Sequence, residues 1–229
     1  MIINKFDIPI YNILIVISVL IGITYIMMSL YNEKLLNKKI VFFIVMFFIF
    51  AFIGGKLYTY ILYDYGFSLW KSSLSSYGGL AFVILASIIY EKIFPTDGKV
   101  IKYTILSLPL IYSFTKIACA FNGCCYGVEY SGPFAVTYPH IMNKSLFPIQ
   151  FLEIILFFSL FLYSNTNKNR KDITYITLLL ISVLKYLVEF LRFERSTIIN
   201  QNQLFSIILF TITLIVYFIN RHSHHQHYF

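Results

Sequence analysis

The sequence predicts an all-α polytopic membrane protein with seven transmembrane helices. Of its 229 residues, 59% are hydrophobic and only 12% are charged, whereas a soluble globular domain averages about 45–50% apolar and about 25% charged residues. The mean hydropathy of +0.75 points the same way. This composition excludes a disordered chain, a disulfide-stabilised secreted scaffold and an ordinary cytosolic enzyme. The number of spans can therefore be counted from the long apolar runs.

Seven apolar runs are long enough to form helices in lipid, which need roughly 20 residues each. In chain order the predicted spans are Ile8–Tyr31, Ile40–Tyr63, Ser75–Phe94, Ile101–Phe121, Phe147–Tyr163, Ile173–Arg192 and Gln203–Ile219. Because no internal repeat and no Pro- or Ser-rich linker interrupts them, residues 1–229 are expected to form a single domain. Residues 122–146 are expected to form an outward-facing loop or cap, and residues 220–229 a cytoplasmic tail that contains histidines.

Cations in alternate loops predict how the helices are oriented. They follow the first, third and fifth spans as Lys34, Lys38 and Lys39, then Lys92, Lys99 and Lys102, then Lys168, Arg170 and Lys171. On the other side there are only Lys71, Lys144 and Arg195, with Lys5 near the N-terminus. Because basic residues concentrate in cytoplasmic loops, the N-terminus is predicted outside and the C-terminus inside. The chain is thus predicted to be a multi-pass protein of the cell membrane.

Six ionisable side chains lie within the predicted spans, where a charge is costly and usually lines a cavity or a path. They are Lys56, Lys116, Glu153, Lys185, Glu189 and Arg192. With a helical rise of about 1.5 Å per residue, the first four of these fall in one layer in the outer half of the membrane.

The spacing of Lys185, Glu189 and Arg192 along the sixth span predicts that one helix face presents all three. Mutual neutralisation within that helix is one interpretation, and outward reach of each lysine stem to the interface is another. Cations outnumber carboxylates four to two among the six residues. We therefore favour a pocket for an anion, for which a phospholipid phosphate is the commonest candidate at this depth.

Glycines recur near the outer ends of three spans, as Gly54 and Gly55, Gly78 and Gly79, and Gly123 and Gly127. Small residues let helices approach closely, which is the simpler interpretation. The functional interpretation is that broken helix ends turn their backbone N–H groups toward a bound anion.

The three cysteines, Cys119, Cys124 and Cys125, lie close together in the sequence. No paired C-x-x-C and no nearby histidine completes a set of four ligands, so no metal site is predicted. A thiol nucleophile activated by Lys116 and small buried packing residues are the two interpretations that remain.

Several short motifs are spread along the chain. The segment Lys116–Gly127 reads K-I-A-C-A-F-N-G-C-C-Y-G. The others are I-Y-N at Tyr11, G-G-K-L-Y from Gly54, S-L-S-S-Y-G-G-L from Ser73, F-P-I-Q-F-L-E from Phe147, the Lys185–Arg192 face, and N-Q-L from Asn202. Together they resemble the prolipoprotein diacylglyceryl transferase family, whose signature is written G-R-x-G-N-F-x-N-G-E-x-x-G. The resemblance covers nearly the whole chain.

The resemblance implies a transferase of lipoprotein biosynthesis in the bacterial plasma (inner) membrane. Such an enzyme moves the diacylglyceryl group of phosphatidylglycerol to the lipobox cysteine thiol of a prolipoprotein signal peptide and releases glycerol phosphate. It needs no metal, no organic cofactor and no nucleic acid. Carried over by position, the catalytic candidates are Tyr77, Lys116, Lys185 and Glu189. The substrate-binding candidates are Tyr11, Lys56, Gly78, Gly79, Asn122, Gly123, Gly127, Gln150, Glu153 and Arg192.

The chain departs from the family pattern at several of these positions. Lys116 and Lys185 stand where the family has arginines, and a lysine offers a point charge in place of a bidentate fork. Tyr77 stands at the motif histidine, and Cys119 and Cys124 replace the first signature Asn and the signature Glu. The sequence is therefore identified as a divergent member. The alternatives are a phospholipid-dependent transferase with another acceptor and a non-catalytic lipid-binding protein on the same scaffold.

Overall fold

The computed structural model describes residues 8–63, 69, 73–137, 144–193 and 199–226. Lys5, Lys71 and Arg195, which were used to predict the orientation, lie outside these ranges, as do residues 227–229 of the expected tail. Part of the expected 122–146 loop, residues 138–143, lies outside them as well.

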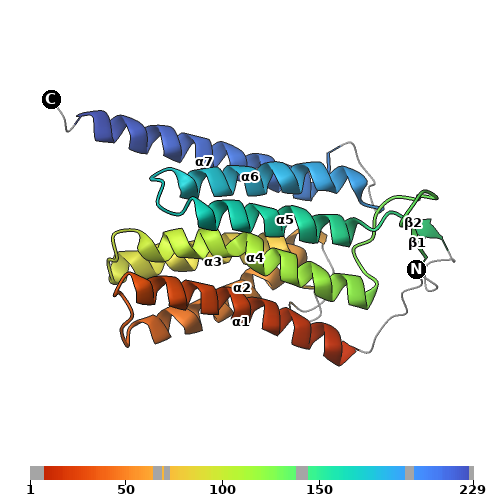
Figure 1. Ribbon diagram of the computed structural model, residues 1–229, viewed down its shortest axis with the longest axis horizontal. Helices are drawn as coiled ribbons and strands as arrows, with labels where there is room; N and C mark the ends of the chain where they lie inside the picture. The colour runs from red at the N-terminus through yellow and green to blue at the C-terminus, as the bar shows by residue number, and fades with distance from the viewer. Residues whose placement is uncertain (1–7, 64–68, 70–72, 138–143, 194–198, 227–229) are drawn as a thin grey trace. The chain divides into compact units, whose positions relative to one another are not determined.

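Helices make up most of the described residues (Figure 1). They are α1 (Ile8–Asn32), α2 (Ile40–Tyr63), α3 (Ser76–Ile93), α4 (Lys99–Asn122), α5 (Ile149–Thr166), α6 (Ile173–Val188) and α7 (Gln201–Gln226). Within the described ranges, seven helical segments are long and apolar enough to cross a membrane. The all-α polytopic fold class is thereby confirmed, whereas the orientation of the termini stays a prediction.

The helix bounds differ from the predicted spans mainly at the two C-terminal helices. Helix α6 ends at Val188, and a 3₁₀ turn, η2 (Glu189–Leu191), follows it. Helix α7 continues to Gln226, past the predicted end at Ile219, because no glycine or proline interrupts the polar residues that follow. The first part of the expected histidine tail is therefore helical.

The chain divides into two compact units, which are described separately. Unit 1 comprises Met1–Ser18 and Tyr112–Phe229, and unit 2 comprises Val19–Ile111. The division passes through α1 and α4 themselves. In α4 it falls just after Pro109, which has no N–H to donate to the helix.

In unit 2, α2 and α3 pack against each other through facing glycines. A Cβ atom added at Gly78 would lie 2.0 Å from the carbonyl oxygen of Gly54, and one at Gly54 would lie 2.4 Å from Phe82. A side chain at either position is therefore incompatible with this contact. For Gly54 and Gly78 the structure favours the close-packing interpretation of the outer glycines.

Unit 2 also contains an ionic contact at the start of α4. The carboxylate of Glu33, just after α1, accepts hydrogen bonds from the Tyr103 hydroxyl at 2.5 Å and from the Lys99 ammonium at 2.9 Å. These hydrogen bonds, Tyr103 first and Lys99 second, lower the pKa of Glu33. The contact therefore ties the α1–α2 connection to α4.

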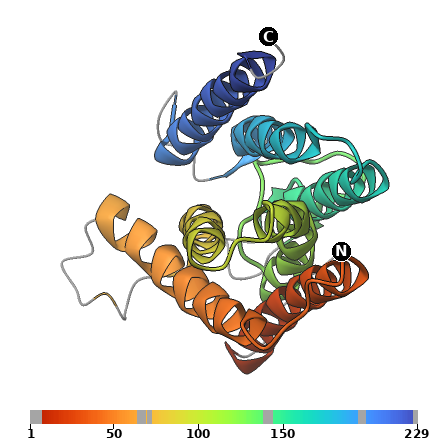
Figure 2. The ribbon, with the colours of Figure 1, turned by 90° about the vertical axis from the view of Figure 1, so that its left-hand side faces the viewer.

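In unit 1, α6 lies between α5 and α7 (Figures 1 and 2). The described residues between α4 and α5 form a small cap in which strand β1 (Val136–Thr137) pairs antiparallel with β2 (Ser145–Leu146). Val136 and Leu146 are buried there against Tyr126 and Phe193. The cap holds the end of α4 close to the start of α5, where several predicted site residues lie.

Candidate functional site

The carboxylate of Glu153, near the start of α5, is the centre of a buried polar cluster in unit 1. Its side chain is 0% exposed. One oxygen, Oε2, lies 3.0 Å from the ammonium of Lys116. The other, Oε1, accepts from the Arg192 guanidinium at 2.7 Å and from the Tyr112 hydroxyl at 2.6 Å. One carboxylate therefore joins α4, α5 and the segment after α6.

Helical spacing explains how α4 and α5 contribute to this contact. Tyr112 and Lys116 are four residues apart on α4, and Gln150 and Glu153 are three apart on α5, so each pair shares a helix face. Helix α5 begins directly after Pro148, which is its N-cap residue. The Gln150 amide donates to the carbonyl of Cys124 at 2.7 Å. The start of α5 is thereby fixed to the end of α4.

The aromatic ring of Tyr112 organises the lysines. The ammonium of Lys185, on α6, lies 3.9 Å from the ring centroid, and that of Lys116 lies 5.0 Å from it. The ring itself packs on Phe157 with a centroid separation of 4.3 Å. Cation–π attraction of this kind contributes about 0.5–2 kcal/mol, with the larger values at desolvated sites.

Glu189 is the second buried carboxylate of the cluster, and two asparagines, one just before α7 and one in its first turn, hold it in place. Its Oε1 accepts from the side-chain amides of Asn200 at 3.0 Å and Asn202 at 2.9 Å. Neither asparagine was among the predicted site residues, although N-Q-L was one of the quoted motifs. Tyr112 was missed too. Its position one turn before Lys116 was the available signal.

The single-face arrangement predicted for Lys185, Glu189 and Arg192 is wrong at Arg192. The α-helix stops at Val188, the 3₁₀ turn follows, and Arg192 has extended backbone angles of φ −80° and ψ 140°. Its guanidinium turns toward α5, so that Nη2 lies 2.7 Å from Glu153. The Nε atom is 3.8 Å from Glu189. Arg192 therefore bridges the two carboxylates because the helix has ended.

The buried ionic cluster consists of Lys116, Lys185, Arg192, Glu153 and Glu189. Among these described residues three are cations and two are carboxylates, so the formal charge is +1. Four of the five residues are buried, and the Arg192 side chain is only 15% exposed. Because an excess charge is costly in such surroundings, the cluster suits an anionic group.

The predicted signature glycines lie beside this cluster. Gly127 pairs with Arg192 in an antiparallel bridge, and a Cβ atom added to Gly127 would lie 2.7 Å from the carbonyl oxygen of Phe147. Gly123 has a positive φ of 62° at the end of α4. Both glycines are therefore needed for backbone geometry. Asn122, the last residue of α4, and Tyr11, on the first part of α1, are half-buried in the same unit.

The remaining predicted residues, Lys56, Tyr77, Gly78 and Gly79, belong to unit 2. The ring of Tyr77 stacks on that of Tyr58 with centroids 5.9 Å apart. The participation of these four residues in the cluster stays a prediction.

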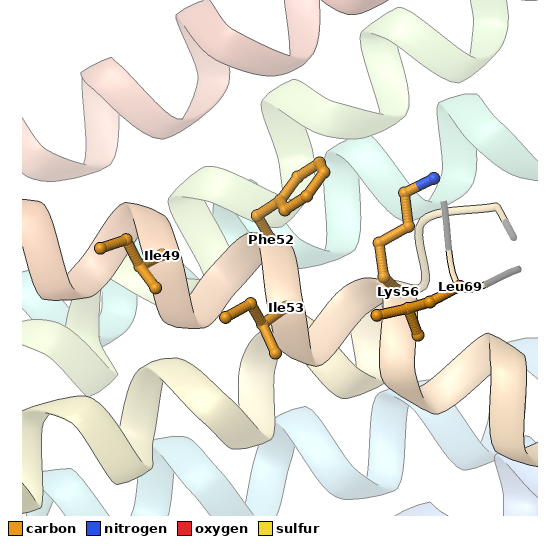
Figure 3. A pocket seen from close by; sticks show the side chains of 5 residues that line it. All are labelled: Ile49, Phe52, Ile53, Lys56 and Leu69. Atoms are coloured by element: carbon orange, nitrogen blue, oxygen red, sulfur yellow. The ribbon is translucent and has the colours of Figure 1, made fainter. Parts of the chain in front are cut away.

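Lys56 lies at an apolar pocket of unit 2. The pocket is lined by Ile49, Phe52, Ile53, Lys56 and Leu69. Figure 3 shows Phe52 and Lys56 extending from the same side of α2. The Lys56 ammonium is 5.9 Å from the Phe52 ring centroid. The anion-binding role of Lys56 stays a prediction.

A family model and a curated relative both match this sequence, and both carry the same family description. A family model described as prolipoprotein diacylglyceryl transferase matches residues 1–219. A curated relative, phosphatidylglycerol–prolipoprotein diacylglyceryl transferase 2 of Clostridium perfringens (strain 13 / Type A), is 29% identical over 125 residues. That alignment covers 50% of this chain and 49% of the relative, so it spans about half of each.

Proposed function

The chain belongs to the prolipoprotein diacylglyceryl transferase family, and on that premise we propose that it moves the diacylglyceryl group of phosphatidylglycerol to the lipobox cysteine of a prolipoprotein. One observation carries the proposal. Three cations and two carboxylates from α4, α5 and the region where α6 ends form one connected set of contacts in unit 1, among residues that the family motifs single out.

In this proposal the cluster binds the phosphate of the lipid. Its formal charge of +1 matches the single negative charge of a phosphodiester, so binding neutralises the buried site. Lys116 and Lys185 contact the phosphate, and Arg192 and Glu189 orient it. Glu153 holds Lys116 and Arg192 in place through contacts of 3.0 and 2.7 Å.

The reaction is a substitution at carbon by sulfur. A new C–S bond forms at the glyceryl carbon, and the bond from that carbon to the phosphate oxygen breaks. The phosphate oxygen keeps the electron pair, and the thiol proton ends on the released glycerol phosphate. Cations held in a buried site favour this step because negative charge builds up on the departing phosphate.

The contacts of Tyr112 support a role for lysines where the family has arginines. An arginine positions itself on phosphate through a planar fork, whereas a lysine is a flexible point charge. Here the Tyr112 ring lies 3.9 Å from the Lys185 ammonium, and Glu153 lies 3.0 Å from that of Lys116. These contacts restrict both lysine stems before any substrate binds.

The test uses purified protein, phosphatidylglycerol labelled in the diacylglyceryl group and a lipobox peptide. We expect a labelled thioether peptide together with released glycerol phosphate. Lys185→Met keeps the side-chain volume but removes the charge, so transfer should be lost while the helical circular dichroism is unchanged. Lys171→Met, at an exposed position after α5, is the matched control and should retain transfer.

The same assay separates the alternatives. Glycerol phosphate released without a thioether peptide would indicate another acceptor. Bound phosphatidylglycerol with neither product would indicate a lipid-binding protein without turnover. Full transfer by the Lys185→Met protein would contradict the assigned role of the cluster.

A further inference from the structure

The three cysteine side chains meet at the end of α4. The Sγ atoms of Cys119, Cys124 and Cys125 all lie within 4.8 Å of one another. All three are free thiols. Cys119 is buried, Cys124 is half-buried and Cys125 is exposed. Within this group of thiols, Cys119 is therefore the buried member and Cys125 the exposed one.

The helix terminus itself brings two of these thiols together. Gly123, with φ 62°, donates to the carbonyl of Ala120, and the N–H of Cys124 donates to the carbonyl of Cys119 at 3.1 Å. This pair of bonds is the Schellman motif, in which the side chains of the first and last residues of the pattern usually touch. Here those residues are Cys119 and Cys124. A thiol pair thus takes the place of the usual apolar contact.

Two side chains from outside the turn bind the backbone of Cys124 and Cys125. Cys125 has a positive φ of 57°, which is uncommon for a residue with a side chain. Its carbonyl accepts from Arg192 at 2.6 Å, and the carbonyl of Cys124 accepts from Gln150 at 2.7 Å. The backbone of both adjacent cysteines is therefore fixed by hydrogen bonds from outside the turn.

We propose that Cys119, Cys124 and Cys125 form a three-thiolate binding site for one thiophilic d¹⁰ cation, Cu⁺ or Zn²⁺. Thiolates are the ligands that select these ions. A metal–sulfur bond of about 2.3 Å in a trigonal arrangement requires sulfurs about 4.0 Å apart. The sulfurs, now within 4.8 Å, need to move by less than about 1 Å for this.

Binding forms three metal–sulfur bonds, releases the thiol protons to solvent and transfers no electron. Cu⁺ is satisfied by three sulfurs, whereas Zn²⁺ adds a water as fourth ligand. The sequence prediction of no metal site assumed that four protein ligands are needed. The present site requires three and is independent of the proposed transferase activity.

The test is an anaerobic titration of the reduced, detergent-purified protein. Cu⁺ is added in competition with a chromophoric chelator, and Zn²⁺ is added in a parallel experiment. We expect one equivalent of at least one ion to bind, with X-ray absorption showing three sulfur neighbours. The ion with the lower dissociation constant is the one that the site prefers.

Single variants test whether all three thiols take part. Cys119→Ser, Cys124→Ser and Cys125→Ser should each weaken binding by at least about 100-fold, since even the loss of an outer-shell partner costs about 10–100-fold. Ala120→Ser adds a hydroxyl on the same turn without removing a thiol, and its affinity should equal that of the parent protein. The proposal is overturned if neither ion binds at one equivalent, or if any cysteine variant binds like the Ala120→Ser control.

Discussion

Replacing Glu153 with glutamine tests the centre of the buried ionic cluster. The change keeps the side-chain shape but removes the charge that Lys116 and Arg192 share, at contacts of 3.0 and 2.7 Å. The formal charge of the cluster rises from +1 to +2 in a site where Glu153 is 0% exposed. Breaking a buried ion pair by removing one partner costs about 3–5 kcal/mol.

The expected loss in the free energy of unfolding for Glu153→Gln is therefore about 3–5 kcal/mol. For a chain of this size, that loss corresponds to a fall in Tm of about 6–20 °C. Thermal unfolding in detergent, followed by circular dichroism, measures it. In the proposed reaction, transfer should also be lost, because Lys116 and Arg192 are then no longer positioned.

Glu129→Gln is the matched control, since Glu129 forms an ion pair with Lys144 but its side chain is 60% exposed. Exposed pairs contribute about 0–1 kcal/mol, so this variant should unfold within a few degrees of the parent protein. Equal Tm values for the two variants would refute the reasoning that Glu153 compensates buried charge. A double variant, Lys116→Gln with Glu153→Gln, should lose less stability than the sum of the single changes, because the two residues are coupled.

Three further predictions concern single contacts. Tyr112→Phe removes the hydroxyl that donates to Glu153 at 2.6 Å but keeps the ring beside Lys185, so the free energy of unfolding should fall by about 1.5–3 kcal/mol in chemical denaturation. Gly78→Ala should lower the free energy of unfolding by about 1–3 kcal/mol, because the new Cβ would lie 2.0 Å from a backbone oxygen. Gly79→Ala is the control and should be tolerated, because the atom nearest to its new Cβ is 3.5 Å away. Glu33 has a lowered pKa in the folded protein, so its contribution to stability is complete above its unfolded-state pKa and is lost as the pH falls through the folded-state value. Glu33→Gln should therefore reduce the acid-range slope of Tm against pH, and an unchanged slope would exclude this contribution.

The sequence by itself determined the class of protein and, over the residues that the structure describes, the number of long apolar helices and most of their bounds. These properties depend on local hydropathy and on helix breakers, which can be read residue by residue. It also identified Lys116, Glu153, Lys185 and Glu189 as charged residues inside spans, because any ionisable group there is unusual. The order of short motifs along the chain was sufficient to recognise the family, which the match over residues 1–219 confirmed.

Which side chains meet was decided only by the tertiary structure. The early end of α6 turned Arg192 away from the predicted helix face and toward Glu153. Tyr112 and Asn200 carry no charge, so hydropathy did not distinguish them from other residues near the membrane interior. The contact of Cys119 with Cys124 depends on how α4 terminates at Gly123. Contacts of this kind join residues that are far apart in sequence or that lie on either side of a turn. They depend on the direction of the backbone and on packing between helices. The spacing of residues within one helix gives no information about either.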